Sequence, residues 1–85
     1  MSREVFKKAL DTWGKDVQLN MLQEECAELI AAVNHLRRGR ATEAEVCAEI
    51  ADVQIMLDQM KLVFSSEDIE GIYNFKVSIL KGRLK

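Results

Sequence analysis

Two pairs of acidic residues are the side chains of this 85-residue chain whose types and spacing best suit chemistry. Glu25 pairs with Glu28, and Glu49 pairs with Asp52, each three residues apart. Residues at this spacing share one face of a helix, so each pair predicts two carboxylates side by side. Four carboxylates that meet repel one another unless a cation lies between them. The pattern therefore predicts a site for a hard divalent cation, Mg²⁺ or alternatively Mn²⁺.

The acidic pairs fall within two long stretches of helical periodicity, which predict neighbouring helices. The first is predicted over about residues 15–38, and the second runs from Thr42 to about Phe64. Gly39 between them predicts a helix end, because glycine readily adopts the left-handed conformation found there. Thr42 and Glu45 have the spacing of a capping box, which predicts where the second helix starts.

Two shorter helices complete the expected secondary structure, over about residues 2–13 and 67–81. No segment alternates with the period of a strand, and the chain contains no proline. Its length suffices for one small core only. The chain is therefore predicted to be a single all-α domain over residues 1–85, a small bundle of about four helices that assembles as a homo-oligomer.

The two long helices repeat the same pattern after a shift of 24 residues. Under this shift Glu25 coincides with Glu49, and Glu28 coincides with Asp52. At ~100° per residue, Glu25 and Glu49 lie about 60° from the centre of the apolar stripe, which predicts partly desolvated carboxylates. The stripes expected to face the core are Leu22, Cys26, Leu29, Val33 and Leu36, and Val46, Ile50, Val53, Leu57 and Met60.

Composition excludes several classes of protein. The net charge of −2 argues against a nucleic-acid binder driven by bulk electrostatics. No apolar run approaches the ~20 residues of a membrane span, and no signal peptide opens the sequence, which predicts a cytoplasmic protein without a membrane partner. Cys26 and Cys47 lie within helical apolar patterns and are predicted to be buried free thiols.

The acidic pairs also carry a family resemblance. EECAEL at residues 24–29 and EIADV at residues 49–53 resemble the EExxEL…ExxD signature of the MazG-like, all-α nucleoside triphosphate pyrophosphohydrolases. The similarity extends from about Trp13 to the lysine-rich end. It implies Mg²⁺-dependent hydrolysis of a (deoxy)nucleoside triphosphate between its α- and β-phosphates, which releases the monophosphate and pyrophosphate. The implied role is control of nucleotide pools.

The resemblance also implies roles for the acidic residues. By match to the signature, Glu25, Glu28, Glu49 and Asp52 hold the metal, and either Glu25 or Glu28 acts as the general base. In such proteins helices from more than one subunit form the pocket. The resemblance thus implies a homodimer or a dimer of dimers.

Basic residues near the end of the chain are candidates for binding phosphate. Lys76, Lys81 and Arg83 fit this role, since the last helix of the family often carries such residues. The match is incomplete, because Lys76 is followed four residues later by Leu80 where relatives often carry Arg. A solvated helix end explains Lys81 and Arg83 equally well.

Recognition of the base has weaker candidates. Trp13 is expected to be an anchor of the core, with stacking on a base as the alternative. Gln18 or Asn20 would be able to bind the edge of a base, and Asn74 is expected either to contact ligand or to cap locally. His35 is expected to be a surface residue.

Two alternatives compete with this interpretation. A di-iron carboxylate bundle normally takes Glu-x-x-His pairs, and neither acidic pair here contains histidine. A non-catalytic dimeric interaction module would instead use the apolar stripes and leave the acids solvated. These two classes differ in whether loss of the carboxylates abolishes a Mg²⁺-dependent activity.

Overall fold

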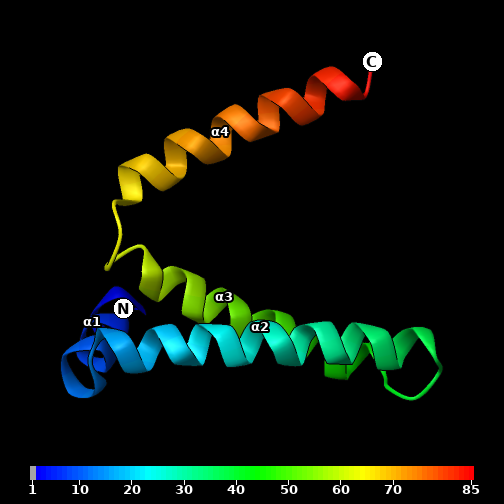
Figure 1. Ribbon diagram of the computed structural model, residues 1–85, viewed down its shortest axis with the longest axis horizontal. Helices are drawn as coiled ribbons and strands as arrows, with labels where there is room; N and C mark the ends of the chain where they lie inside the picture. Colours follow the sequence, from blue (N-terminus) through cyan, green and yellow to red (C-terminus); the bar gives the residue numbers. More distant parts are fainter. Residues whose placement is uncertain (1) are drawn as a thin grey trace.

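The computed structural model describes residues 2–85 and contains four α-helices and no strand in that range (Figure 1). The prediction of an all-α chain of about four helices is confirmed. The helices are α1 (Ser2–Trp13), α2 (Lys15–Arg37), α3 (Glu43–Met60) and α4 (Ser66–Arg83). The third helix ends before the predicted Phe64, because the N–H groups of Leu62 and Val63 turn back to the carbonyls of Gln59 and Met60. The fourth helix extends two residues beyond the predicted Lys81.

The connection between α2 and α3 follows the predicted signals. Gly39 has a φ of 71° and its N–H donates to the carbonyl of Leu36 at 2.9 Å. The Arg40 N–H donates to the carbonyl of His35 at 2.8 Å, which completes a Schellman motif at the end of α2. Thr42 and Glu45 form the predicted capping box, with bonds of 3.2 Å to Thr42 Oγ1 and 3.0 Å to Glu45 Oε2. The two long helices are therefore joined by five residues and must lie antiparallel.

The α2–α3 hairpin is the largest packed unit, and α1 crosses one end of it (Figure 1). Gly14, with a φ of 89°, turns the chain between α1 and α2. Met56 and Met60 are buried between the helices, together with the polar side chains of Gln18 and Gln59. The core therefore lies at the end of the hairpin that α1 covers.

The predicted apolar stripes face the core only in part. Val33, Ile50 and Leu57 remain between 40 % and 47 % exposed, so their prediction as core residues was wrong. The two long helices are rotated so that the edges bearing Glu25 and Glu49 turn toward the facing helix, and both residues are half-buried. This rotation moves part of each stripe to one flank of the hairpin.

Helix α4 projects away from the other helices. Among the described residues it makes no close backbone contact with α1, α2 or α3 (Figure 1). The helical pattern of this segment predicts an inward side formed by Ile69, Ile72, Tyr73, Lys76, Ile79 and Leu80. Ile69 is half-buried, whereas the other five are exposed within one chain. The described part of the chain therefore leaves most of this face uncovered.

Two further burial predictions were wrong. Trp13 was expected to anchor the core, but it ends α1 with 62 % of its surface exposed. Cys47 is exposed rather than buried, while Cys26 is half-buried, and both are free thiols. Over residues 2–85 the structure holds no helix both long enough and apolar enough to span a membrane.

Candidate metal centre

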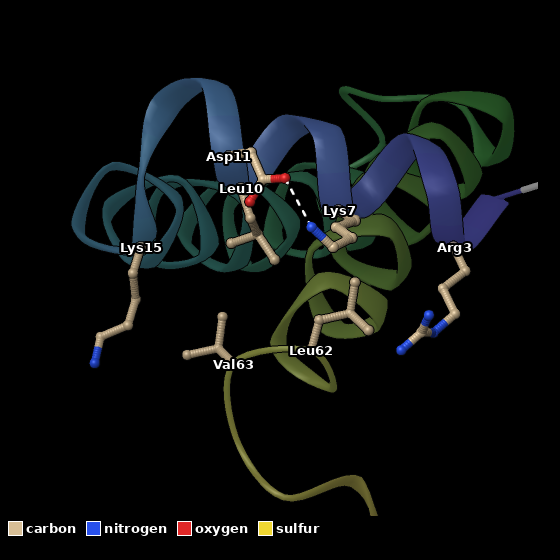
Figure 2. A pocket seen from close by; sticks show the side chains of 7 residues that line it. All are labelled: Arg3, Lys7, Leu10, Asp11, Lys15, Leu62 and Val63. Carbon is tan, nitrogen blue, oxygen red and sulfur yellow. Dashed lines mark hydrogen bonds and ion pairs between the residues drawn. The ribbon is translucent and has the colours of Figure 1, made fainter.

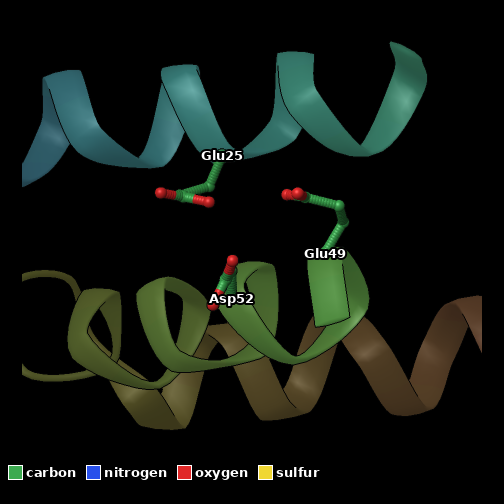
Figure 3. Close-up of side chains that lie close together, drawn as sticks. All are labelled: Glu25, Glu49 and Asp52. Carbon is green, nitrogen blue, oxygen red and sulfur yellow. The ribbon is translucent and has the colours of Figure 1, made fainter. Parts of the chain in front are cut away.

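Three carboxylates converge between the two long helices. Glu25 points down from α2, and Glu49 and Asp52 point up from successive turns of α3 into the same space (Figure 3). One oxygen from each residue lies within 4.8 Å of the others. The predicted pairs are thus brought together by the antiparallel hairpin, with the fourth residue, Glu28, one turn further along α2.

The local sequence explains why these side chains meet. Glu25 and Glu49 occupy equivalent positions in the 24-residue repeat, so each lies at the same angle on its helix. Because the five-residue connection makes the helices antiparallel, equal angles on the two helices aim the side chains at one another. The convergence therefore follows from the repeat together with the Gly39 turn.

Two of the carboxylate oxygens are buried without a partner. Oε2 of Glu25 and Oε2 of Glu49 accept no hydrogen bond from any residue that the structure describes. Within residues 2–85 the ion pairs are Lys7–Asp11 and Lys61–Asp58, and neither involves the cluster. A buried carboxylate that lacks both a donor and a counter-charge is costly, so this cluster requires a proton or a cation from elsewhere.

The electrostatics of the cluster point in the same direction. Burial raises the pKa of the Glu25 carboxyl, and the neighbouring charges of Glu28 and Asp52 raise it further. Burial likewise raises the pKa of Glu49, and the same two neighbours add to the effect. Glu28 therefore belongs to the cluster electrostatically, although its own side chain is exposed. Each of these effects favours a neutralised site.

The donor set fits a hard divalent cation. All the ligand atoms are carboxylate oxygens, which Mg²⁺, Mn²⁺ and Ca²⁺ prefer over nitrogen and sulfur. With bond lengths of about 2.1 Å, opposite ligand oxygens of Mg²⁺ are about 4.2 Å apart and neighbouring ones about 3.0 Å apart. The oxygens of Glu25, Glu49 and Asp52 lie within 4.8 Å of one another, so their side chains would have to move closer together to share one such ion.

A hollow of about 400 Å³ adjoins the cluster near the connection between α2 and α3. It shares two acidic residues with the cluster, Glu28 and Glu49. The sequence interpretation did not assign His35 or Glu45 to a site, yet both line this hollow, and His35 is exposed as predicted. Three alanines in the lining leave the space open, which is the one sequence signal for it. The lining residues are Glu28, Ala31, Ala32, His35, Ala41, Glu45 and Glu49.

The predicted substrate-binding residues are not brought to the cluster within one chain. Asn74, Lys76, Lys81 and Arg83 all lie exposed on α4, which does not contact α2 or α3. Trp13 precedes α2, whereas Glu25 lies ten residues into that helix, or about 15 Å along its axis. One chain therefore supplies the carboxylates without the basic groups.

A second hollow, of about 420 Å³, lies beside α1 and is lined by several basic side chains (Figure 2). Arg3, Lys7 and Lys15 surround a floor formed by Leu62 and Val63, among others. Lys7 Nζ also donates to Asp11 Oδ2 at 2.9 Å, so part of this charge is neutralised locally. The hollow involves α1 and the segment after α3, whereas the hollow beside the cluster lies at the opposite end of the hairpin.

Within residues 2–85 the site thus consists of a carboxylate cluster and an adjoining hollow whose lining contains no lysine or arginine. A scan against models of protein families, a search of curated proteins and a search of solved structures each give no match for this chain.

Proposed function

We propose that this chain is a Mg²⁺-dependent, MazG-like nucleoside triphosphate pyrophosphohydrolase that works as a homodimer or a dimer of dimers in nucleotide-pool control. The observation that carries the proposal is the convergence of Glu25, Glu49 and Asp52, two of them with buried oxygens that have no partner. The resemblance of residues 24–29 and 49–53 to the pyrophosphohydrolase signature supports the choice of substrate class.

Under this proposal Glu25, Glu28, Glu49 and Asp52 hold the metal. Bound Mg²⁺ supplies neutralisation of the triphosphate charge and orientation of the phosphates. Glu25 or Glu28 accepts the proton of the attacking water. The raised pKa of Glu25 supports that residue, because a carboxyl that titrates nearer neutrality is a stronger base. The exposure of Glu28 at the hollow supports the other choice, because water reaches it there.

The hollow beside the cluster is the proposed place for the substrate. Its volume of about 400 Å³ is in the usual range for small-molecule pockets. Its lining contains no lysine or arginine, so the metal alone cannot balance the charge of a triphosphate. We therefore propose that basic residues on α4 of another subunit bind phosphate, with Lys76, Lys81 and Arg83 as the candidates. Asn74 and Trp13 are the proposed residues for further contacts with the nucleotide.

A panel of nucleoside and deoxynucleoside triphosphates tests the proposal. With Mg²⁺, at least one of them should yield the monophosphate and pyrophosphate, with little orthophosphate. Glu25→Gln should abolish this turnover while the protein stays folded. Glu24→Gln is the matched control, because Glu24 is the exposed neighbour on the same helix and the charge changes equally. A panel in which no triphosphate releases pyrophosphate rejects the proposal.

A non-catalytic dimeric interaction module is the second candidate. The exposed apolar face of α4 favours it, because such a face suits a partner whether or not the chain has an activity. Glu25→Gln combined with Asp52→Asn separates the two functions. If the chain is an interaction module, the double variant should keep both its fold and its assembly. If it is a pyrophosphohydrolase, the double variant should keep its fold and lose Mg²⁺-dependent turnover.

A further inference from the structure

Helix α4 is an amphipathic helix without a partner in its own chain. Its apolar residues include Tyr73 and Phe75, which are 65 % and 66 % exposed. Lys61 to Ser65 link it to α3, and no residue pair joins it closely to α1, α2 or α3 within the described part of the chain (Figure 1). A helix of 18 residues with no close backbone contact to another helix is marginal in water. It therefore needs a partner that lies outside the chain.

The exposed area of the chain gives the size of the missing contact. The chain exposes 6931 Å², about 1,800 Å² more than the roughly 5,100 Å² expected for a folded monomer of 9.7 kDa. Its radius of gyration is 15.5 Å, against about 12 Å expected for a compact domain of this length. Two copies that each bury this excess would share about 3,600 Å², within the roughly 2,000–5,000 Å² of obligate homodimers.

The charges of α4 are segregated along its length. Glu67, Asp68 and Glu70 occupy its start, and no acidic residue follows them in the helix. Its later part carries Lys76, Lys81 and Arg83. Two such helices attract each other when antiparallel, because each acidic end then lies beside the basic end of the other. A parallel pair would instead bring like charges together.

We propose that α4 pairs antiparallel with α4 of a second copy of this chain, about a two-fold axis. A few side chains of the partner helix enter the hollow between α3 and α4, which has a volume of about 570 Å³ and is lined in part by Leu57, Met60, Ile69 and Tyr73. A self-complementary surface is what a two-fold interface requires, and a helix with one acidic and one basic end provides it. This pairing gives the proposed homodimer a specific interface and does not depend on the metal.

Helical geometry identifies which charges face the interface. At 100° per residue, Lys76 lies about 5° from the centre of the apolar face, Arg83 about 25° and Asp68 about 85°, whereas Glu67 and Lys81 lie about 175° and about 135° away. Asp68 and Arg83 are therefore the opposite charges that meet across an antiparallel pair. The two copies of Lys76 lie near the two-fold axis, where their long side chains must extend to the edges of the interface to reach water. Glu67 and Lys81 lie on the solvent side and serve as matched controls of the same charge.

The mass of the assembly in solution, measured by light scattering and sedimentation without metal or nucleotide, tests this proposal. The wild type should have at least twice the 9.7 kDa of one chain. Arg83→Glu and Asp68→Lys should each weaken the pairing by about tenfold or more, because each brings like charges together. The double variant should regain most of the affinity, since the attraction is restored with its sign reversed. Glu67→Lys and Lys81→Glu should leave the affinity within about threefold of wild type.

The apolar face has its own test. Leu80→Gln should dissociate the pair and leave the chain folded, because Leu80 is exposed in the single chain and contributes nothing to its core. A wild type that is monomeric in the micromolar range overturns the proposal. An assembly that ignores Leu80→Gln, or charge reversals that do not compensate one another, overturns it as well. Because no nucleotide is present, these outcomes are independent of whether the chain hydrolyses triphosphates.

Discussion

Replacing Glu25 by glutamine should reverse the order of stability between variant and wild type when Mg²⁺ is added. Without metal, the variant should be the more stable, because it removes one of the like charges that raise the pKa of the cluster. With metal, the wild type should be the more stable, because it keeps all three converging carboxylates. The substitution preserves the shape of the side chain, so packing of the hairpin changes little.

The size of the effect follows from linkage between binding and folding. A cation that binds only the folded state stabilises it by about 2.7 kcal/mol at a hundredfold excess over its Kd. For a domain of 85 residues, 1 kcal/mol shifts Tm by roughly 4–8 °C, so Tm of the wild type should rise by about 10–20 °C. If loss of one ligand weakens binding about hundredfold, the same Mg²⁺ concentration stabilises the variant by only about 0.4 kcal/mol, or about 2–3 °C.

Thermal unfolding followed by circular dichroism measures both effects, at one fixed protein concentration so that self-association does not alter Tm. Glu24→Gln is the control, since it removes the same charge from the exposed neighbour and should keep the full Mg²⁺ shift. The metal hypothesis is refuted if Glu25→Gln retains the wild-type shift. It is equally refuted if the control loses the shift, because the response would then reflect net charge alone.

Three further predictions concern the helix ends and the titration of the cluster. Thr42→Ala should lower the free energy of unfolding by about 1 kcal/mol in urea denaturation. Thr42→Ser should leave it unchanged, because the capping box needs only the hydroxyl. Equal losses in the two variants would contradict this prediction. Gly39→Ala should lower the free energy of unfolding by about 1–2 kcal/mol because Gly39 has a positive φ, whereas Gly71→Ala inside α4 should raise it by about 0.5–1 kcal/mol. Effects of the same sign would contradict the backbone conformations of these two glycines. In the presence of EDTA, the free energy of unfolding should fall as the pH rises from 4.5, the ordinary pKa of glutamate, through the raised pKa of Glu25. The reason is that the Glu25 carboxyl holds its proton more tightly in the folded state than in the unfolded chain. Urea midpoints across this range should show a weaker fall for Glu25→Gln, and an unchanged slope would contradict the raised pKa.

The helices were predictable because their signals are local. The positive φ of Gly39 and the capping box at Thr42 depend on a few neighbouring residues, and the structure contains both. The partial desolvation of Glu25 and Glu49 was also predictable, since the helical repeat sets their angle from the apolar stripe. Each of these features requires only the geometry of one helix.

The rotation of the hairpin and the position of α4 were not predictable in the same way. The stripes identify an apolar direction on each helix, but the buried Gln18 and Gln59 and the inward Glu25 turn the real contact away from it. Periodicity likewise marks an apolar face on α4 without saying which surface covers it. Both features depend on contacts between elements, and those of α4 are absent from the described part of the chain.

The five-residue connection between α2 and α3 also affects the order of folding. Glu25 and Glu49 are only 24 residues apart, so the hairpin that joins them has low contact order and should form rapidly. Helix α4 gains little in this step, because within residues 2–85 it makes no close backbone contact with the other helices. We therefore expect refolding in two kinetic phases, a fast one independent of protein concentration and a slower one whose rate rises with it. A newly made chain would thus acquire its carboxylate cluster while still alone, before it meets a second copy.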